Sequence, residues 1–317
     1  MKKYIVLLLV VLMALSVVAC SADPDKNNTD STTASVDVNT ETKPATVPQG
    51  TGIDVDSVYP DDKNDIKVEV NTDFEEEVVF DDNDIKVSVT EISNDDLLGP
   101  CVTFLVENSS DKNIFVTTAN LSINDCAVTT SLFAEVAAGK STYQDMYVFK
   151  SSLNESNITE VGKIEFILEV QDADSFDYVA KSEIITLILD SNVNQEFTSD
   201  GEVIYNSDGV TVYCEAPDFK DDGINDYVAK FLIINDTGKN IRLTADNTSV
   251  DGFMIYPLFY AEIPAGKCGY AHISFMQDEL EESNISDIKE VEFILQGFDS
   301  DTVDLEFESD IITIKAK

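Results

Sequence analysis

The sequence predicts an all-β protein with two tandem β-sandwich domains, and three observations support this fold class. The first is an internal duplication: Lys112-Asn113-Ile114 recurs as Lys239-Asn240-Ile241, 127 residues later. The second is the alternation of apolar and polar residues, as at Ile85, Val87 and Val89, which is typical of half-buried strands. The third is the regular spacing of turn-forming residues, which separate about seven short apolar runs in each copy.

The duplicated unit is long enough to be a domain. The offset of 127 residues holds without a gap through most of each copy, and it falls to 125 near the start, so the second copy has a loop two residues longer around residues 217–226. A repeat of this length has its own core, unlike the units of a solenoid. We therefore place the two domains at residues 66–190 and 191–317.

The strands are expected in the same order in both copies. In the first copy, the apolar runs lie at residues 85–89, 102–106, 143–149, 164–170 and 184–189. Asn108–Asp111 and Asn235–Gly238 have the composition of hairpin turns. The exception is residues 151–161 and their partners 278–288, where isolated apolar residues lie in a polar background. We expect one helical turn there, at a crossing between sheets.

The first 19 residues predict an export signal. Lys2 and Lys3 precede the apolar stretch Tyr4–Ser16, which is too short to cross a bilayer comfortably, and Ala19 places a small residue directly before Cys20. This arrangement resembles the lipobox of bacterial lipoproteins. The resemblance implies that the signal is cut off and that Cys20 becomes the lipidated first residue of a protein anchored to the outer face of the cell membrane. The alternative is an ordinary secretory signal beside an incidental cysteine.

Residues 20–65 are expected to form a disordered acidic tether. They are rich in Ser, Thr, Asp and Asn and have no apolar periodicity. A flexible chain of this length has an end-to-end distance of about 35 to 40 Å, which would hold the folded part away from the membrane. The alternative is a segment that recruits a basic partner.

The charge of the chain excludes one large class of partners. The 61 acidic residues outnumber the 20 Lys and Arg, which gives a net charge of −41, and removal of residues 1–19 would change it to −43. A surface of this sign repels the phosphates of nucleic acids. Because the charge also opposes self-association, a monomer is expected.

Further motifs connect the duplicated domains with a known group. These are the turns Ala137–Lys140 and Pro264–Lys267, and a Glu-Phe-Ile-Leu strand that each copy follows with an Asp-rich hairpin. They resemble the immunoglobulin-like domains found on lipoproteins of Gram-positive bacteria, a group largely of unknown function. The resemblance covers about residues 76–317. It implies an exported binding or structural module and supplies no catalytic residues.

The Asp-rich hairpins are candidate calcium sites. The motif Asp-x-Asp-x-x-Asp presents three oxygen ligands on one short turn in each domain, which suits Ca²⁺. Its residues are Asp172, Asp174 and Asp177 in the first copy and Asp299, Asp301 and Asp304 in the second. Solvated Asx turns explain the same residues without a metal, and we expect no other cofactor.

A run of large apolar residues, Phe253–Tyr260, is a candidate binding patch. Its leading residues are Phe253, Tyr256, Phe259 and Tyr260. In a strand both faces of this run would be apolar, so one face must join the core. The other face would be covered by the protein's own chain, which is the favoured interpretation, or would recognise a protein or a glycan.

The remaining cysteines and the one histidine predict no catalytic or metal chemistry. Cys101, Cys126, Cys214 and Cys268 align with residues other than cysteine in the opposite copy, so free buried thiols are favoured over bridges from Cys101 to Cys126 and from Cys214 to Cys268. His272 is expected to point outward from a strand. The chain is therefore predicted to be a non-enzymatic binding or structural module; the alternatives are an accessory or regulatory subunit of a membrane complex and a hydrolase that uses acidic residues.

Overall fold

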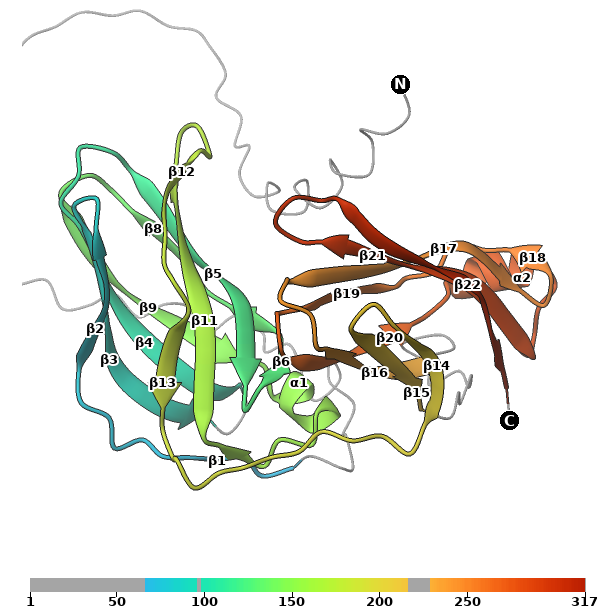
Figure 1. The fold of residues 1–317 in the computed structure, drawn as a ribbon. Coiled ribbons are helices and arrows are strands. Elements are labelled where there is room, and N and C mark those ends of the chain that lie inside the picture. The colour runs from blue at the N-terminus through green and yellow to red at the C-terminus, as the bar shows by residue number, and fades with distance from the viewer. Residues whose placement is uncertain (1–65, 96–97, 216–228, 317) are drawn as a thin grey trace, which may run out of the picture. The chain divides into compact units, whose positions relative to one another are not determined.

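A computed structural model of the chain describes residues 66–95, 98–215 and 229–316. The export signal, Cys20 and the tether lie outside these residues. The described chain is built mainly from strands, in two sets that each enclose a hydrophobic core (Figure 1). The predicted all-β fold class is therefore confirmed. No helix in the described ranges is long and apolar enough to cross a membrane.

The first set of strands forms two facing sheets. One sheet has the order β2 (Glu77–Asp82), β3 (Ile85–Asp95), β4 (Gly99–Asn108), β9 (Lys140–Val148) and β7 (Thr130–Ser131). The other has β12 (Tyr178–Lys181), β11 (Lys163–Asp172) and β5 (Ile114–Ile123), with β13 (Ile185–Ile188) paired to β11, and with β8 (Phe133–Val136) and β6 (Cys126–Ala127) paired to β5. Two short strands, β1 (Glu69–Val70) and β10 (Glu160–Val161), form a separate parallel pair.

The second set repeats this arrangement. One sheet has the order β14 (Glu202–Ser207), β15 (Val210–Cys214), β16 (Ala229–Asn235) and β20 (Cys268–Ile273). The other has β18 (Phe253–Met254), β17 (Ile241–Val250), β21 (Glu290–Asp299) and β22 (Leu305–Lys315), with β19 (Tyr260–Ile263) paired to β17. Because matched segments of the two copies take matched places, the duplication in the sequence is also a duplication in the fold.

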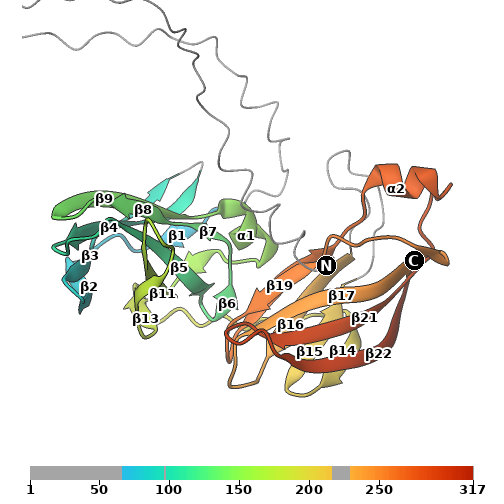
Figure 2. The same cartoon turned by 90° about the horizontal axis from the view of Figure 1, so that it is seen from above.

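A single helical turn follows β9 and β20, as predicted. These turns are α1 (Lys150–Glu155) and α2 (Gln277–Glu282), and each carries the chain from one sheet of its set to the other (Figure 2). Leu153 and Leu280 hold the helices in place, because both side chains are buried in the cores.

Alternation of buried and less buried residues builds much of the two cores, although β11 and β16 each bury three consecutive residues. In β21, Val291, Phe293 and Leu295 point inward and their neighbours are less buried, because successive side chains of a strand face opposite sides of the sheet. An aromatic pair joins the two sheets of each set. Phe104 and Phe166 meet edge to face at 5.7 Å between ring centres in the first core, and the matched residues of the second core are 6.4 Å apart.

The two sets are joined through one short strand pairing. All described residues fall in one compact unit of the chain. Within it β6 of the first set pairs in parallel with β20 of the second, and Cys268 N donates to Asp125 O at 3.0 Å. Leu232 and Cys268 pack against the first core, so the contact between the sets is partly apolar.

Candidate functional site

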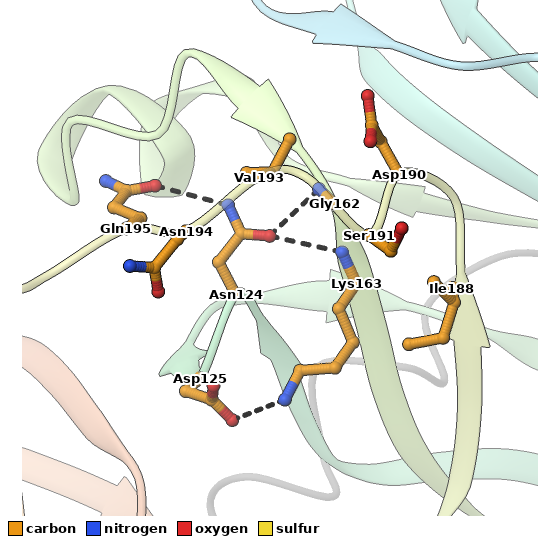
Figure 3. Close-up of a pocket in the computed structure, with 10 residues that line it drawn as sticks. All are labelled: Asn124, Asp125, Gly162, Lys163, Ile188, Asp190, Ser191, Val193, Asn194 and Gln195. Carbon is orange, nitrogen blue, oxygen red and sulfur yellow. Dashed lines mark hydrogen bonds and ion pairs between the residues drawn. The ribbon is translucent and has the colours of Figure 1, made fainter.

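A polar cavity of about 350 Å³ lies between the first set of strands and the segment that leads to the second (Figure 3). Asn124, which is almost fully buried, organises this cavity. Its Oδ1 accepts hydrogen bonds from Gly162 N at 2.9 Å and Lys163 N at 3.1 Å, and its Nδ2 donates to Glu160 O at 2.8 Å and to Gln195 Oε1 at 3.2 Å. The amide therefore ties the β5–β6 turn to β11 and to the connecting segment.

The matched residue in the second copy shows that this role of Asn124 is structural. Asp251 occupies the same turn position, and its Oδ1 accepts hydrogen bonds from Lys289 N at 3.1 Å and Glu290 N at 2.9 Å. Both residues have positive φ, which a short turn between strands requires and which Asn and Asp tolerate better than most residues. The amide of Asn124 is thus engaged in holding the turn.

An ion cluster borders the cavity and joins the two sets. Lys163 Nζ lies 2.7 Å from Asp125 Oδ1 and 2.9 Å from Glu165 Oε2, and Lys267 of the second set contacts the same two carboxylates. Burial raises the pKa of Asp125, but hydrogen bonds from Lys163 and Lys267 outweigh this effect and hold that pKa below its usual value. The two carboxylates and two ammonium groups balance in charge, so the cluster leaves no unpaired group for a ligand.

The run Phe253–Tyr260 exposes five large apolar or aromatic side chains on the second set. Met254 and Tyr256 are 71% and 84% exposed, and Phe253, Leu258 and Tyr260 are each more than half exposed. We name these five residues the apolar surface. Tyr260 lines a cavity together with residues of the first set, but all five side chains stay more than half exposed in the described ranges, so the favoured expectation of coverage by the protein's own chain is not met there.

Phe259 does not belong to this surface. Its ring packs edge to face on Phe231, 5.6 Å between centres, and contributes to the second core together with the buried Ile255. Of the four residues predicted to lead the patch, Phe253, Tyr256 and Tyr260 are exposed, whereas Phe259 points inward. Simple alternation along the run does not account for this, because Phe253 would share the face of residues 255 and 259 and is nevertheless exposed; strand β18 ends at Met254 and β19 begins at Tyr260.

The Asp-rich hairpins are Asx turns. Asp172 Oδ1 accepts hydrogen bonds from Asp174 N at 2.9 Å and Ser175 N at 3.2 Å, and its Oδ2 lies 2.8 Å from Lys112 Nζ. The ammonium group of Lys112 and the two backbone N–H groups lower the pKa of Asp172 to about 2. Asp299 makes the same contacts with Asp301 N, Thr302 N and Lys239 Nζ.

These contacts occupy the leading carboxylate of each hairpin. In the described ranges no three His, Cys, Asp or Glu side chains form a group that could hold a metal ion. The candidate calcium residues of the two hairpins therefore lack the converging geometry that Ca²⁺ coordination requires.

His272 takes part in the contact between the two sets. Its Nδ1 lies 3.1 Å from Glu155 Oε1 of α1, and its side chain is 41% exposed. The expectation that it points outward is met only in part, because the outward side of β20 faces the first set. Lys230 reaches the same region and donates from Nζ to Glu155 O at 2.8 Å.

Sequence reasoning missed the contact between the sets. Asp125, Lys163 and Lys267 were not singled out, since each is one charged residue among many. A signal existed in the comparison of the two copies: Gly252 and Glu290 stand where the first copy has Asp125 and Lys163. The signal is partial, because Lys267 and Glu165 have a residue of the same type, Lys140 and Glu292, in the other copy.

Comparisons with known proteins add little to this description. No protein-family model matches the chain, and no curated protein matches it. Among solved structures, the YadV chaperone aligns with 10% identity over 73% of this chain and 99% of its own, with a TM-score of 0.24. A protein of unknown function from Porphyromonas gingivalis W83 aligns with 14% identity over 74% of this chain and all of its own, with a TM-score of 0.21. Likenesses at these TM-scores carry no argument about function.

Proposed function

We propose that the protein is an exported, lipid-anchored and non-enzymatic module whose second domain binds a protein partner. The observation that carries the proposal is the apolar surface, whose five large side chains are all more than half exposed. Exposed apolar patches of this kind are uncommon on soluble proteins and often mark interaction sites. The matched segment of the first copy is plainer in sequence, and it is partly used in the contact with the second set.

The chemistry of the apolar surface favours a protein partner over a glycan. Tyr residues supply large, stiff contact areas with a polar end, and Met254 adapts its shape to a facing surface. Glycan-binding surfaces often stack sugars on Trp, and this chain contains none.

The border of the surface indicates the charge of the partner. Glu262 accepts a hydrogen bond from the Tyr260 hydroxyl at 2.9 Å, and Glu279 accepts one from Tyr256 N at 3.3 Å. Acidic groups beside exposed aromatic rings suit an apolar patch ringed by Lys or Arg on the partner.

The non-enzymatic part of the proposal is supported by the engagement of the candidate groups. His272 lies against Glu155, and the Asn124 amide at the cavity is engaged in the turn. In the described residues no nucleophile, general base and orienting group come together as acyl transfer or hydrolysis would need.

The binding proposal is tested by removing the apolar surface without disturbing the core. Met254→Ser with Tyr256→Ser should abolish capture of a membrane protein partner by the purified ectodomain, measured by crosslinking on intact cells and mass spectrometry. The matched control is Tyr178→Ser, which removes a ring of similar exposure, 63%, from the first set. Equal capture by all variants would overturn the proposal, and binding to a glycan array that the double variant loses would reassign the ligand.

The anchor is tested separately. Cys20→Ala should convert a membrane-bound protein into a released or unprocessed one, because acyl chains on Cys20 would no longer hold it in the bilayer. The readout is partitioning into detergent together with the mass of the N-terminus. Unchanged partitioning and processing would contradict lipid anchoring. The soluble ectodomain needs no anchor to capture a partner, so the binding proposal can still be tested if lipid anchoring is contradicted.

A further inference from the structure

Two cysteines from different copies meet where the two sets of strands join. Cys126 of β6 and Cys268 of β20 are directly opposite each other in the parallel pairing. Cys126 is fully buried and Cys268 is 7% exposed. Neighbouring strands lie about 4.7 to 4.9 Å apart, and disulfides join Cα atoms that are roughly 4.4 to 6.8 Å apart. The backbone therefore places these residues within the range of a disulfide.

The surrounding residues bring the two strands close. Gly269 follows Cys268, and a Cβ atom at this position would lie 3.2 Å from Ala127 Cβ and 2.5 Å from Ile263 Cδ1. The close approach thus needs glycine in β20 and a small residue in β6. The opposing Cys268 N–H is itself hydrogen-bonded to the first set, which holds the register of the two cysteines.

The two thiols also interact directly. A side-chain hydrogen bond from Cys268 lowers the pKa of Cys126, and the same bond raises the pKa of Cys268. The Cys126 sulfur has Ser156 Oγ as a further neighbour at 3.6 Å. The protonation of one thiol therefore depends on that of the other.

The other two cysteines face residues other than cysteine across their strands. Cys101 lies opposite Ser93 and Tyr147, and Cys214 lies opposite Glu202 and Phe231. The bridges considered from the sequence, from Cys101 to Cys126 and from Cys214 to Cys268, are not formed in the described chain.

We propose that Cys126 and Cys268 form a disulfide between the two domains when the folded protein meets an organic disulfide as oxidant. One of the two cysteines gives up its proton, and its thiolate attacks one sulfur of the oxidant, forms a mixed disulfide and releases one thiolate. The other cysteine then gives up its proton, attacks the protein sulfur of the mixed disulfide and releases the second thiolate. The protein loses two protons and two electrons, and the oxidant leaves as two thiols.

A second cavity lies close to the pair. It has a volume of about 240 Å³ and is lined by residues of both sets, including Ala127, Ser156 and Tyr270. Ser156 lines this cavity, and its Oγ lies 3.6 Å from the Cys126 sulfur, so a small molecule in the cavity would be separated from the thiol by this one residue. The bond would fix β6 against β20 and so hold the two domains in one arrangement. This inference does not depend on the proposed binding function.

The test is oxidation of the folded ectodomain with hydroxyethyl disulfide. After the reaction, remaining thiols are alkylated in denaturant and the protein is digested and mapped by mass spectrometry. The expected product is one linked peptide pair that contains Cys126 and Cys268, with the protein still monomeric and with Cys101 and Cys214 alkylated. The same oxidation in guanidinium chloride should yield a mixture of pairings, because the folded contact is lost.

The control variants replace a cysteine by the residue at the matched position of the other copy. Cys268→Ser introduces the residue that the first copy has at Ser141, and it should abolish the linked pair. Cys101→Val with Cys214→Val introduces the residues matched to them in the other copy, and it should leave the linked pair unchanged. Three results for the folded wild-type protein would each overturn the proposal. The first is that Cys126 and Cys268 are both alkylated after oxidation. The others are a bridge to Cys101 or Cys214, and a bridge between two molecules. The wild-type map decides the question even where a variant fails to fold.

Discussion

Asn235 is a buried side chain that holds together the end of a hairpin and a neighbouring strand. Its Nδ2 donates to Lys239 O and Ile263 O, each at 2.8 Å, and its Oδ1 accepts a hydrogen bond from Thr237 N at 3.0 Å. Asn108 makes the matched contacts in the first copy. The sequence predicts only a turn at these positions; the structure shows that the amide also satisfies buried carbonyl groups of β19 or β8.

Replacement of this amide should therefore destabilise the second domain. Asn235→Ala leaves buried carbonyl oxygens without donors, and we expect a loss of about 3 kcal/mol in the free energy of unfolding, measured with urea. Asn206→Ala, at an exposed position of β14, is the control and should change that free energy by less than about 0.5 kcal/mol. Equal effects of the two substitutions would show that the buried amide has no special role.

Asp172 makes stability depend on pH in the acid range. Its pKa is lowered from 3.8 to about 2 in the folded protein, chiefly by the hydrogen bond from Lys112. The group therefore stabilises the fold above pH 3.8, and this contribution is lost as the pH falls through about 2. The melting temperature of Asp172→Asn should lie below that of the wild type at pH 7, and the two values should converge toward pH 2. Asp177→Asn, at an exposed position, should shift the melting temperature little and show no such convergence.

At the scale of elements, the pairing of β6 with β20 depends on a charge cluster as well as on backbone contacts. Lys267 and Glu165 are 13% and 14% exposed, so their ion pair is shielded from solvent far more than a surface pair. Lys163 contacts the same carboxylate from the first set. A shielded carboxylate that loses one of two cations is destabilised, although less than one that loses its only partner.

Lys267→Met should accordingly weaken the contact between the two sets. We expect a loss of about 1.5 kcal/mol in the free energy of unfolding of the ectodomain, between the values for exposed and buried pairs. The control is Lys315→Met, which removes a surface pair with Glu290 and the same formal charge, and it should cost less than about 0.5 kcal/mol. If the two variants unfold alike, the cluster contributes only net charge.

At the scale of the whole molecule, each set of strands has its own core, and each core also contacts residues of the other set. Leu232 packs against the first core, and Ala127 packs against the second. The two domains should thus be separable, while each loses some buried apolar surface when the other is removed.

Residues 66–190 and 191–317 should each fold when produced alone. We expect circular dichroism rich in β-structure and cooperative unfolding for both, with the second half melting below its temperature in the intact ectodomain because Leu232 becomes exposed. If Leu232→Thr raises the melting temperature of the isolated second half, exposure of Leu232 is supported as the cause of the lower value. The absence of cooperative unfolding in both halves would contradict the division into two domains.

The sequence by itself determined the class of fold and the order of its elements. The alternation in Ile85, Val87 and Val89 and the repetition over 127 residues are local and periodic signals, and both the strands and the two helical turns follow from them. Local pattern suffices here because the face that a side chain takes in a strand depends on its position along that strand. The candidate surface residues Phe253, Tyr256 and Tyr260 could also be named in this way.

The tertiary structure alone decided which residues the two copies bring together. Three contacts join segments more than 100 residues apart in the sequence. They are Cys126 with Cys268, Lys267 with Glu165, and His272 with Glu155. Contacts between domains follow neither the period of a strand nor the repeat, because each copy supplies a different surface to them. For the same reason the cysteines, which occupy unmatched positions in the two sequences, become neighbours only when β6 pairs with β20.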